Sequence, residues 1–141
     1  LGMIALPARL SPLAWHIHEM LYGYTAAAIA GFLLTAIPNW TGRLPVNGMP
    51  LAALAIIWLA GRFAMLAPPV AGTLAAAAID IAFLASLFAL AAREVIAGKN
   101  WRNLRVLAIV GVLIAGNAVF HYETLSDGRA DYGVRVAIAS V

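Results

Sequence analysis

The stretch LYGYTAAAIAGFLLTAIP, residues 21–38, has no charged side chain along its whole length. A helix needs roughly 20 residues to cross about 30 Å of hydrocarbon at 1.5 Å per residue. Ser11 and Pro12, a capping hydroxyl followed by a proline, give a start signal upstream. The stretch therefore predicts a membrane-spanning helix over about residues 12–37.

Three further apolar stretches are long enough to span, at residues 50–67, 72–92 and 104–121, and residues 134–141 begin a fifth. Prolines mark their limits, at Pro38, Pro50, Pro68 and Pro69. Alternation with a period of two, typical of half-buried strands, is absent. The sequence predicts an all-α polytopic transmembrane bundle that forms a single domain over residues 1–141.

The overall composition agrees with a lipid environment. Hydrophobic residues make up 64% of the chain and charged residues 11%, against about a quarter charged in soluble domains. The net charge of +3 is scattered, without the basic and aromatic alternation of a nucleic-acid groove. The absence of cysteine excludes disulfides, thiolate metal sites and cysteine nucleophiles. Hydrolytic and phosphate-binding motifs are also absent, and the composition leaves enzymatic activity undecided.

The two ends of the sequence suggest a longer parent protein. The chain begins at Leu1 and ends at Val141, inside an apolar run that has just begun. We expect the sequence to be an internal piece of a membrane protein whose partners are the lipid bilayer and the remaining spans.

The loop charges predict the orientation of the spans. Five basic residues gather on one side, namely Arg43, Arg93, Lys99, Arg102 and Arg105. The other side mixes both signs, with Arg9, Arg129 and Arg135 beside Glu123, Asp127 and Asp131. Because cytoplasmic loops are enriched in lysine and arginine, we expect the first side to be cytoplasmic.

Polar side chains gather at the opposite, outer end of the predicted bundle. They are His16, His18, Glu19, Arg62, Asp80, Asn117 and His121. Arg62 and Asp80 lie at similar depth, roughly 8 and 12 Å inside their spans. An unpaired charge at such depth costs about 2.5–3.5 kcal/mol, so we expect the two to pair. Asn117 is four residues before His121 and therefore on the same helix face.

The spacing of the first two histidines separates their roles, because residues two apart on a helix point in nearly opposite directions. A stripe that repeats every four residues follows them, at Glu19, Gly23, Ala27, Gly31 and Thr35. Such stripes of mainly small residues let transmembrane helices pack closely. His16 joins this stripe, so we favour His16 over His18 as the partner of His121 in a cofactor site.

The chemistry of these groups leaves two functions open. Imidazoles ligate haem iron, copper and zinc, and their second nitrogen needs a partner such as Glu19 or Asn117. A redox or sensing protein could hold a cofactor through His16, His18 and His121. Each histidine alone also fits an interfacial residue. In a transporter or scaffold without a cofactor, the Arg62–Asp80 pair would line or lock a path.

A family resemblance adds to this interpretation. The matching elements are WHIHEM (15–20), GFLLTA (31–36), NWTGR (39–43), Trp58 with Gly61 and Arg62, Asp80 with Phe83, RNLR (102–105), and Asn117 with His121. Together they cover most of residues 11–122, and the chain resembles the NnrS family of bacterial membrane proteins.

The resemblance implies a multi-pass protein of the bacterial inner membrane that contains b-type haem and copper. It also implies a link to nitric oxide, as a ligand or through protection from nitrosative stress. The family's chains are longer, so this piece would lack their first span and their carboxyl-terminal half. The resemblance does not assign individual histidines to haem or copper.

Overall fold

The computed structural model describes residues 11–66, 73–126 and 131–140, and these residues form helices and short connections without any strand. Pro68, Pro69 and the loop charges Arg9, Asp127 and Arg129 lie outside the described residues. The predicted all-α class is confirmed. Four of the helices are long and apolar enough to cross a membrane.

The first span is one continuous helix of 30 residues, Pro12–Thr41. It consists of α1 (Pro12–His18), the π-helical segment η1 (Glu19–Thr25) and α2 (Ala26–Thr41). As predicted, Ser11 caps it by accepting a hydrogen bond from the backbone N–H of Ala14 at 3.1 Å, and Pro12 occupies its first turn.

The first span ends later than the sequence predicted. Pro38 lies inside α2, and the helix continues to Thr41. A proline removes one backbone donor and can bend a helix without ending it, and transmembrane helices tolerate proline. Gly42 ends the helix instead, because its φ of 67° is a left-handed conformation and its N–H donates to the carbonyl of Pro38 at 2.9 Å.

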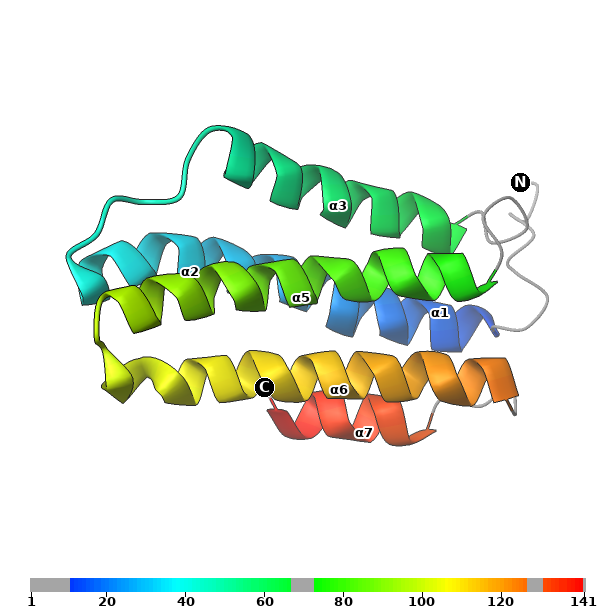
Figure 1. Cartoon of the computed structure of the whole chain (residues 1–141). Helices are drawn as coiled ribbons and strands as arrows, with labels where there is room; N and C mark the ends of the chain where they lie inside the picture. The colour runs from blue at the N-terminus through cyan, green and yellow to red at the C-terminus, as the bar shows by residue number, and fades with distance from the viewer. Residues whose placement is uncertain (1–10, 67–72, 127–130, 141) are drawn as a thin grey trace.

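The remaining helices are α3 (Met49–Leu66), α5 (Thr73–Ala97), the 3₁₀ turn η2 (Trp101–Asn103), α6 (Leu104–Ser126) and α7 (Asp131–Ser140). Figure 1 shows α2, α5 and α6 running side by side, with α3 against α5 and the short α7 against α6. The helices α5 and α6 extend beyond the predicted spans, and α7 begins three residues before the predicted fifth one.

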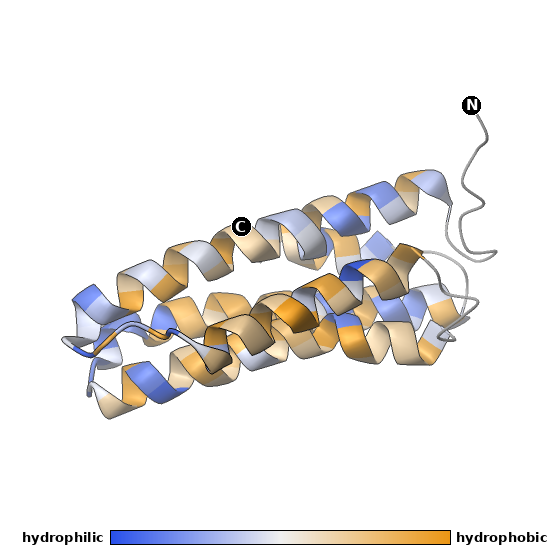
Figure 2. Ribbon diagram, turned by 90° about the horizontal axis from the view of Figure 1, so that it is seen from above, coloured by the Kyte–Doolittle hydropathy of each residue, from blue (hydrophilic) through white to orange (hydrophobic). Residues whose placement is uncertain are grey.

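The core is built mainly from aliphatic side chains of α2, α5 and α6, among them Leu33, Leu84, Leu87, Val110 and Leu113. Large apolar residues also cover the outside, including Phe32, Ile56, Phe63 and Leu74. Figure 2 shows hydrophobic residues through the middle of the bundle and hydrophilic ones mainly toward its two ends. An apolar exterior of this kind fits a lipid surrounding.

The connections divide the polar residues between the two ends of the bundle. The segments 42–48 and 98–100 lie at one end, and the start of α1, the end of α3, the start of α5 and the end of α6 lie at the other (Figure 1). The second end contains the polar residues that the sequence predicted to lie together.

Candidate metal centre

Asp80 is the centre of a buried polar network. Its side chain lies in the amino-terminal half of α5 and is 1% exposed. One carboxylate oxygen, Oδ1, accepts a hydrogen bond from Nη2 of Arg62 on α3. The other, Oδ2, accepts one from Nδ2 of Asn117 at 2.8 Å. The predicted Arg62–Asp80 pair is therefore confirmed.

Two imidazoles converge on the same carboxylate oxygen. Nε2 of His121 lies 3.0 Å from Oδ2 of Asp80, and Nε2 of His18 lies 3.1 Å from it. His18 is completely buried, and His121 is 7% exposed. Their ring centroids are 5.2 Å apart. The sequence positions come from three different helices, α1, α5 and α6, so only the folded bundle brings them together.

The imidazole of His18 has partners on both nitrogens. Its Nδ1 lies 3.4 Å from Oε1 of Glu19, and its Nε2 lies 3.2 Å from the amide oxygen of Asn117. The rings of Tyr22 and Phe120 lie 5.2 and 4.7 Å from the His18 ring, centroid to centroid. These contacts, from η1 and α6, hold the ring in place.

Arg62 links the carboxylates of two spans. Its Nη1 donates to Oε2 of Glu19 at 2.8 Å, while Nη2 binds Asp80. Gly23 makes room for this guanidinium, because a Cβ at that position would collide with Nη1 of Arg62. The hydrogen bonds of the described residues leave Nε of Arg62 without a partner.

The donor set suits a single metal ion. One donor atom each from His18, Asp80 and His121 lies within 4.8 Å of the others. Donors about 2.0–2.2 Å from a tetrahedral ion are roughly 3.3–3.6 Å apart. The two histidine–aspartate separations of 3.0 and 3.1 Å are close to that spacing. Two imidazoles with a carboxylate suit copper, zinc or non-haem iron.

A haem between His18 and His121 does not fit the same geometry. Two imidazoles that ligate one haem iron stand on opposite faces of the porphyrin. Here both Nε2 atoms contact one oxygen of Asp80, so a carboxylate occupies the space between them.

His16 lies away from this network, contrary to the predicted packing of the first span. Its side chain is exposed, whereas His18 is buried. The reason is the π-helical segment that follows them, since a turn closed by i→i+5 bonds holds about one residue more than an α-turn. The buried positions of this span are His18, Tyr22, Gly23, Ala26, Ala30, Leu33 and Ile37. The predicted stripe is wrong at Gly31 and Thr35, both of which are exposed.

Tyr22 was not foreseen as part of the site. Its hydroxyl donates to the carbonyl of Gly133 on α7 at 2.7 Å, which ties the first span to α7 beside His18. Its position four residues after His18 was the available signal. Near a span end, however, a tyrosine also fits an interfacial anchor.

Comparison with known protein families gives one finding. The sequence profile described as NnrS protein matches residues 1–141, which is the whole sequence. Curated proteins and solved structures give no match.

Proposed function

The chain belongs to the NnrS family, and from this premise we propose that it binds copper and acts in the bacterial response to nitric oxide. The observation that supports the proposal is the convergence of His18, Asp80 and His121 on one point inside the bundle. Copper is favoured over zinc and iron by the family resemblance. The donor set itself accepts all three.

The chain's own residues divide the work of holding such an ion. His18 and His121 present Nε2 atoms, and Asp80 presents Oδ2. Arg62 holds the other oxygen of Asp80, which turns Oδ2 toward the imidazoles. With a metal on Nε2 of His18, its Nδ1–H would donate to Glu19, the kind of outer partner that fixes a ligand ring.

A bound copper ion supplies one-electron redox chemistry and a position for a small ligand such as nitric oxide. Phe120 and Tyr22 pack around the ring of His18, which shields this imidazole from bulk water. Haem binding rests on the family resemblance alone. His16 is the histidine outside the buried network, and its role as a haem ligand remains a prediction.

Three glutamine variants of the full-length protein test the assignment. Glutamine keeps hydrogen-bonding capacity but lacks an imidazole, so His18→Gln and His121→Gln should each lose most of the bound copper. His16→Gln is the matched control on the same helix and should keep it. Metal content per protein is measured by mass spectrometry, with haem measured separately from its absorption spectrum. Full copper occupancy in the His18→Gln, His121→Gln double variant would contradict the proposal.

A second function, a transporter or scaffold without a cofactor, is favoured by one observation. Asp80 has hydrogen-bonding partners on both oxygens from protein groups alone. In that case the wild-type protein would purify without copper or haem under conditions that preserve metals. Cells that carry His18→Gln would then resist nitric oxide as well as the wild type, whereas the copper proposal expects them to be more sensitive.

A further inference from the structure

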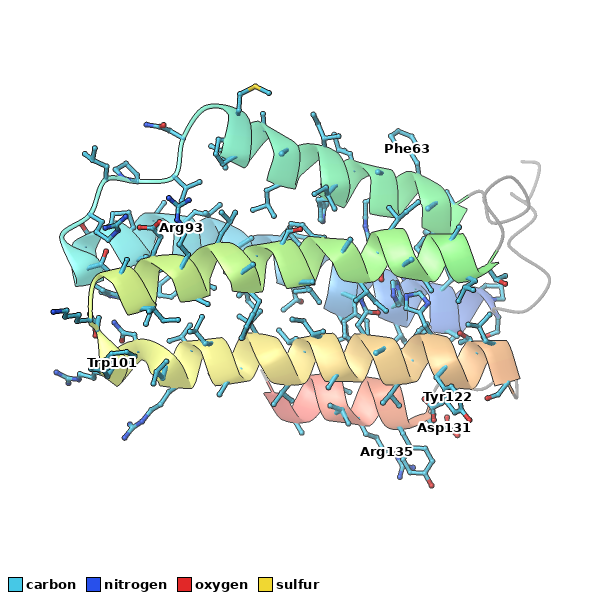
Figure 3. All side chains as sticks on the ribbon, viewed as in Figure 1. Phe63, Arg93, Trp101, Tyr122, Asp131 and Arg135 are labelled. Carbon is cyan, nitrogen blue, oxygen red and sulfur yellow. The ribbon has the colours of Figure 1, made fainter. Side chains whose placement is uncertain are left out.

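A cavity of about 550 Å³ opens at the other end of the bundle, away from the histidines. The connection 42–47 and Pro50 form one side, and Leu90, Arg93 and Glu94 of α5 form the other. Its volume falls in the range of small-molecule sites, roughly 300–1,000 Å³. Figure 3 shows the Arg93 side chain on the side of α5 that faces this connection.

Two guanidinium groups share one carboxylate in this cavity. Nε of Arg43 donates to Oε2 of Glu94 at 2.5 Å, and Nε of Arg93 lies 3.9 Å from Oε1. The Glu94 side chain is 11% exposed, whereas those of Arg43 and Arg93 are 41% and 71% exposed. Among the described residues, the hydrogen bonds of the Arg43 side chain use Nε only. The cavity therefore has one excess positive charge and free N–H donors.

Apolar side chains border the cavity on the side of α2 and α5. A narrower pocket adjoins it and shares Leu44, Val46, Leu90 and Glu94 as lining residues. Its remaining lining comes from α2 and α5, at Leu34, Ile37, Pro38, Leu87 and Ala91. The basic residues of the cavity thus lie beside apolar side chains of α2, α5 and the connection, an arrangement that matches an amphiphile better than a soluble anion.

The position of the cavity fits the headgroup level of a bilayer. It lies where the first span ends at Thr41 and the next begins at Met49. Basic pockets between transmembrane helices at this level bind anionic lipid headgroups. We propose that Arg43 and Arg93, held by Glu94, bind the phosphate of an anionic phospholipid whose acyl chains lie along α2 and α5.

Thermal unfolding of the full-length protein in neutral detergent tests this site. Dioleoyl phosphatidylglycerol should raise the unfolding temperature saturably, whereas dioleoyl phosphatidylcholine and inorganic phosphate should not. Arg43→Gln with Arg93→Gln should abolish the rise. Arg102→Gln with Arg105→Gln, which removes the same charge outside the cavity, should preserve it.

The exposed Arg93 provides a variant that leaves the Arg43–Glu94 pair in place. Arg93→Gln alone should raise the lipid concentration needed for half-saturation by about fivefold, as expected when one basic contact with an anionic lipid is lost. Native mass spectrometry should show fewer phosphatidylglycerol molecules retained on this variant. An equal response to inorganic phosphate, an equal response to phosphatidylcholine, or an unchanged response in Arg93→Gln would overturn the proposal.

Discussion

At the scale of single residues, Asp80 depends on side chains from three other helical segments, since His18, Arg62, Asn117 and His121 all contact its carboxylate. A buried charge that loses its partner is left uncompensated. The stability of the histidine-containing end of the bundle therefore depends on this one carboxylate.

Removal of either member of the Arg62–Asp80 pair should destabilise the protein strongly. Arg62→Gln and Asp80→Asn should each cost about 3–5 kcal/mol, because each leaves a buried charge without its partner. The measurement is unfolding of the membrane-extracted protein. The double variant should cost less than the sum of the two single variants, as contacting residues are not additive. Strict additivity, or two silent single variants, would show that the pair does not exist.

Two glycines of the first span should respond oppositely to alanine. Gly23→Ala pushes a methyl group against Arg62, and we expect a loss of about 1–3 kcal/mol, as for other overpacked sites. Gly31→Ala meets no atom within 4 Å and should be neutral or stabilising by up to about 1 kcal/mol, since alanine favours a helix. Equal unfolding temperatures of the two variants would contradict the placement of Arg62 beside Gly23.

At this scale, the depth of a residue along its helix could be predicted from the sequence. Which residues of the first span face the interior of the bundle could not. Counting 1.5 Å per residue placed Arg62 and Asp80 at similar depth, and they do pair. The prediction failed for His16 and His18 because it took the stripe of small residues at four-residue intervals as the buried face and did not include a π-helical turn at residues 19–25. No residue type marks a π-helical turn in advance.

At the scale of elements, η1 sets which residues of the first span face the bundle. Its seven residues, Glu19–Thr25, contain a side-chain bond that spans five positions, from Oγ1 of Thr25 to the carbonyl of Met20 at 2.8 Å. The widened turn takes up about one extra residue. The helices α1 and α2 therefore face the same directions as they would in a regular α-helix with one residue fewer between them.

Deletions on the two sides of this boundary distinguish the roles of η1 and α2. Deletion of Tyr24, an exposed residue within η1, should remove the extra residue and leave His18 turned toward Asp80. Deletion of Ala28, an exposed residue of α2, should rotate everything before it by about 100° and bury a different face. Bound copper in the full-length protein measures the outcome. Copper lost from the Tyr24 deletion but retained in the Ala28 deletion would contradict the role of η1.

At the scale of the whole molecule, hydropathy was enough to predict the class and the four spans. Hydropathy could not predict the specific polar contacts at the end of the bundle away from the histidines. There Glu94 pairs with Arg43, and the amide of Asn100 donates to the carbonyl of Trp40 at 2.5 Å. These contacts join residues about fifty or sixty positions apart. Charged side chains near the ends of spans can be hydrated by water, so nothing in the sequence gave a reason to expect them to pair with specific residues.

The sidedness of the bundle remains a prediction from loop charge, and cysteine labelling tests it. The sequence has no cysteine, so a single introduced cysteine is labelled without background from other residues of this sequence. Lys99→Cys should resist a membrane-impermeant maleimide applied to intact cells, because the segment 98–100 is expected in the cytoplasm. Ser126→Cys, exposed at the opposite end, should react. The reverse pattern would invert the orientation.

The Arg62–Asp80 pair also bears on how the chain enters the membrane during synthesis. The span with Arg62 is translated before the span with Asp80, and α6 follows both. Either charge alone would cost about 2.5–3.5 kcal/mol at the bilayer centre. If α3 and α5 leave the insertion machinery as a hairpin, each charge meets its counterion before α6 has been made. The histidine of α6 then joins a carboxylate that is already neutralised, so translation order sets the sequence in which the network around Asp80 assembles.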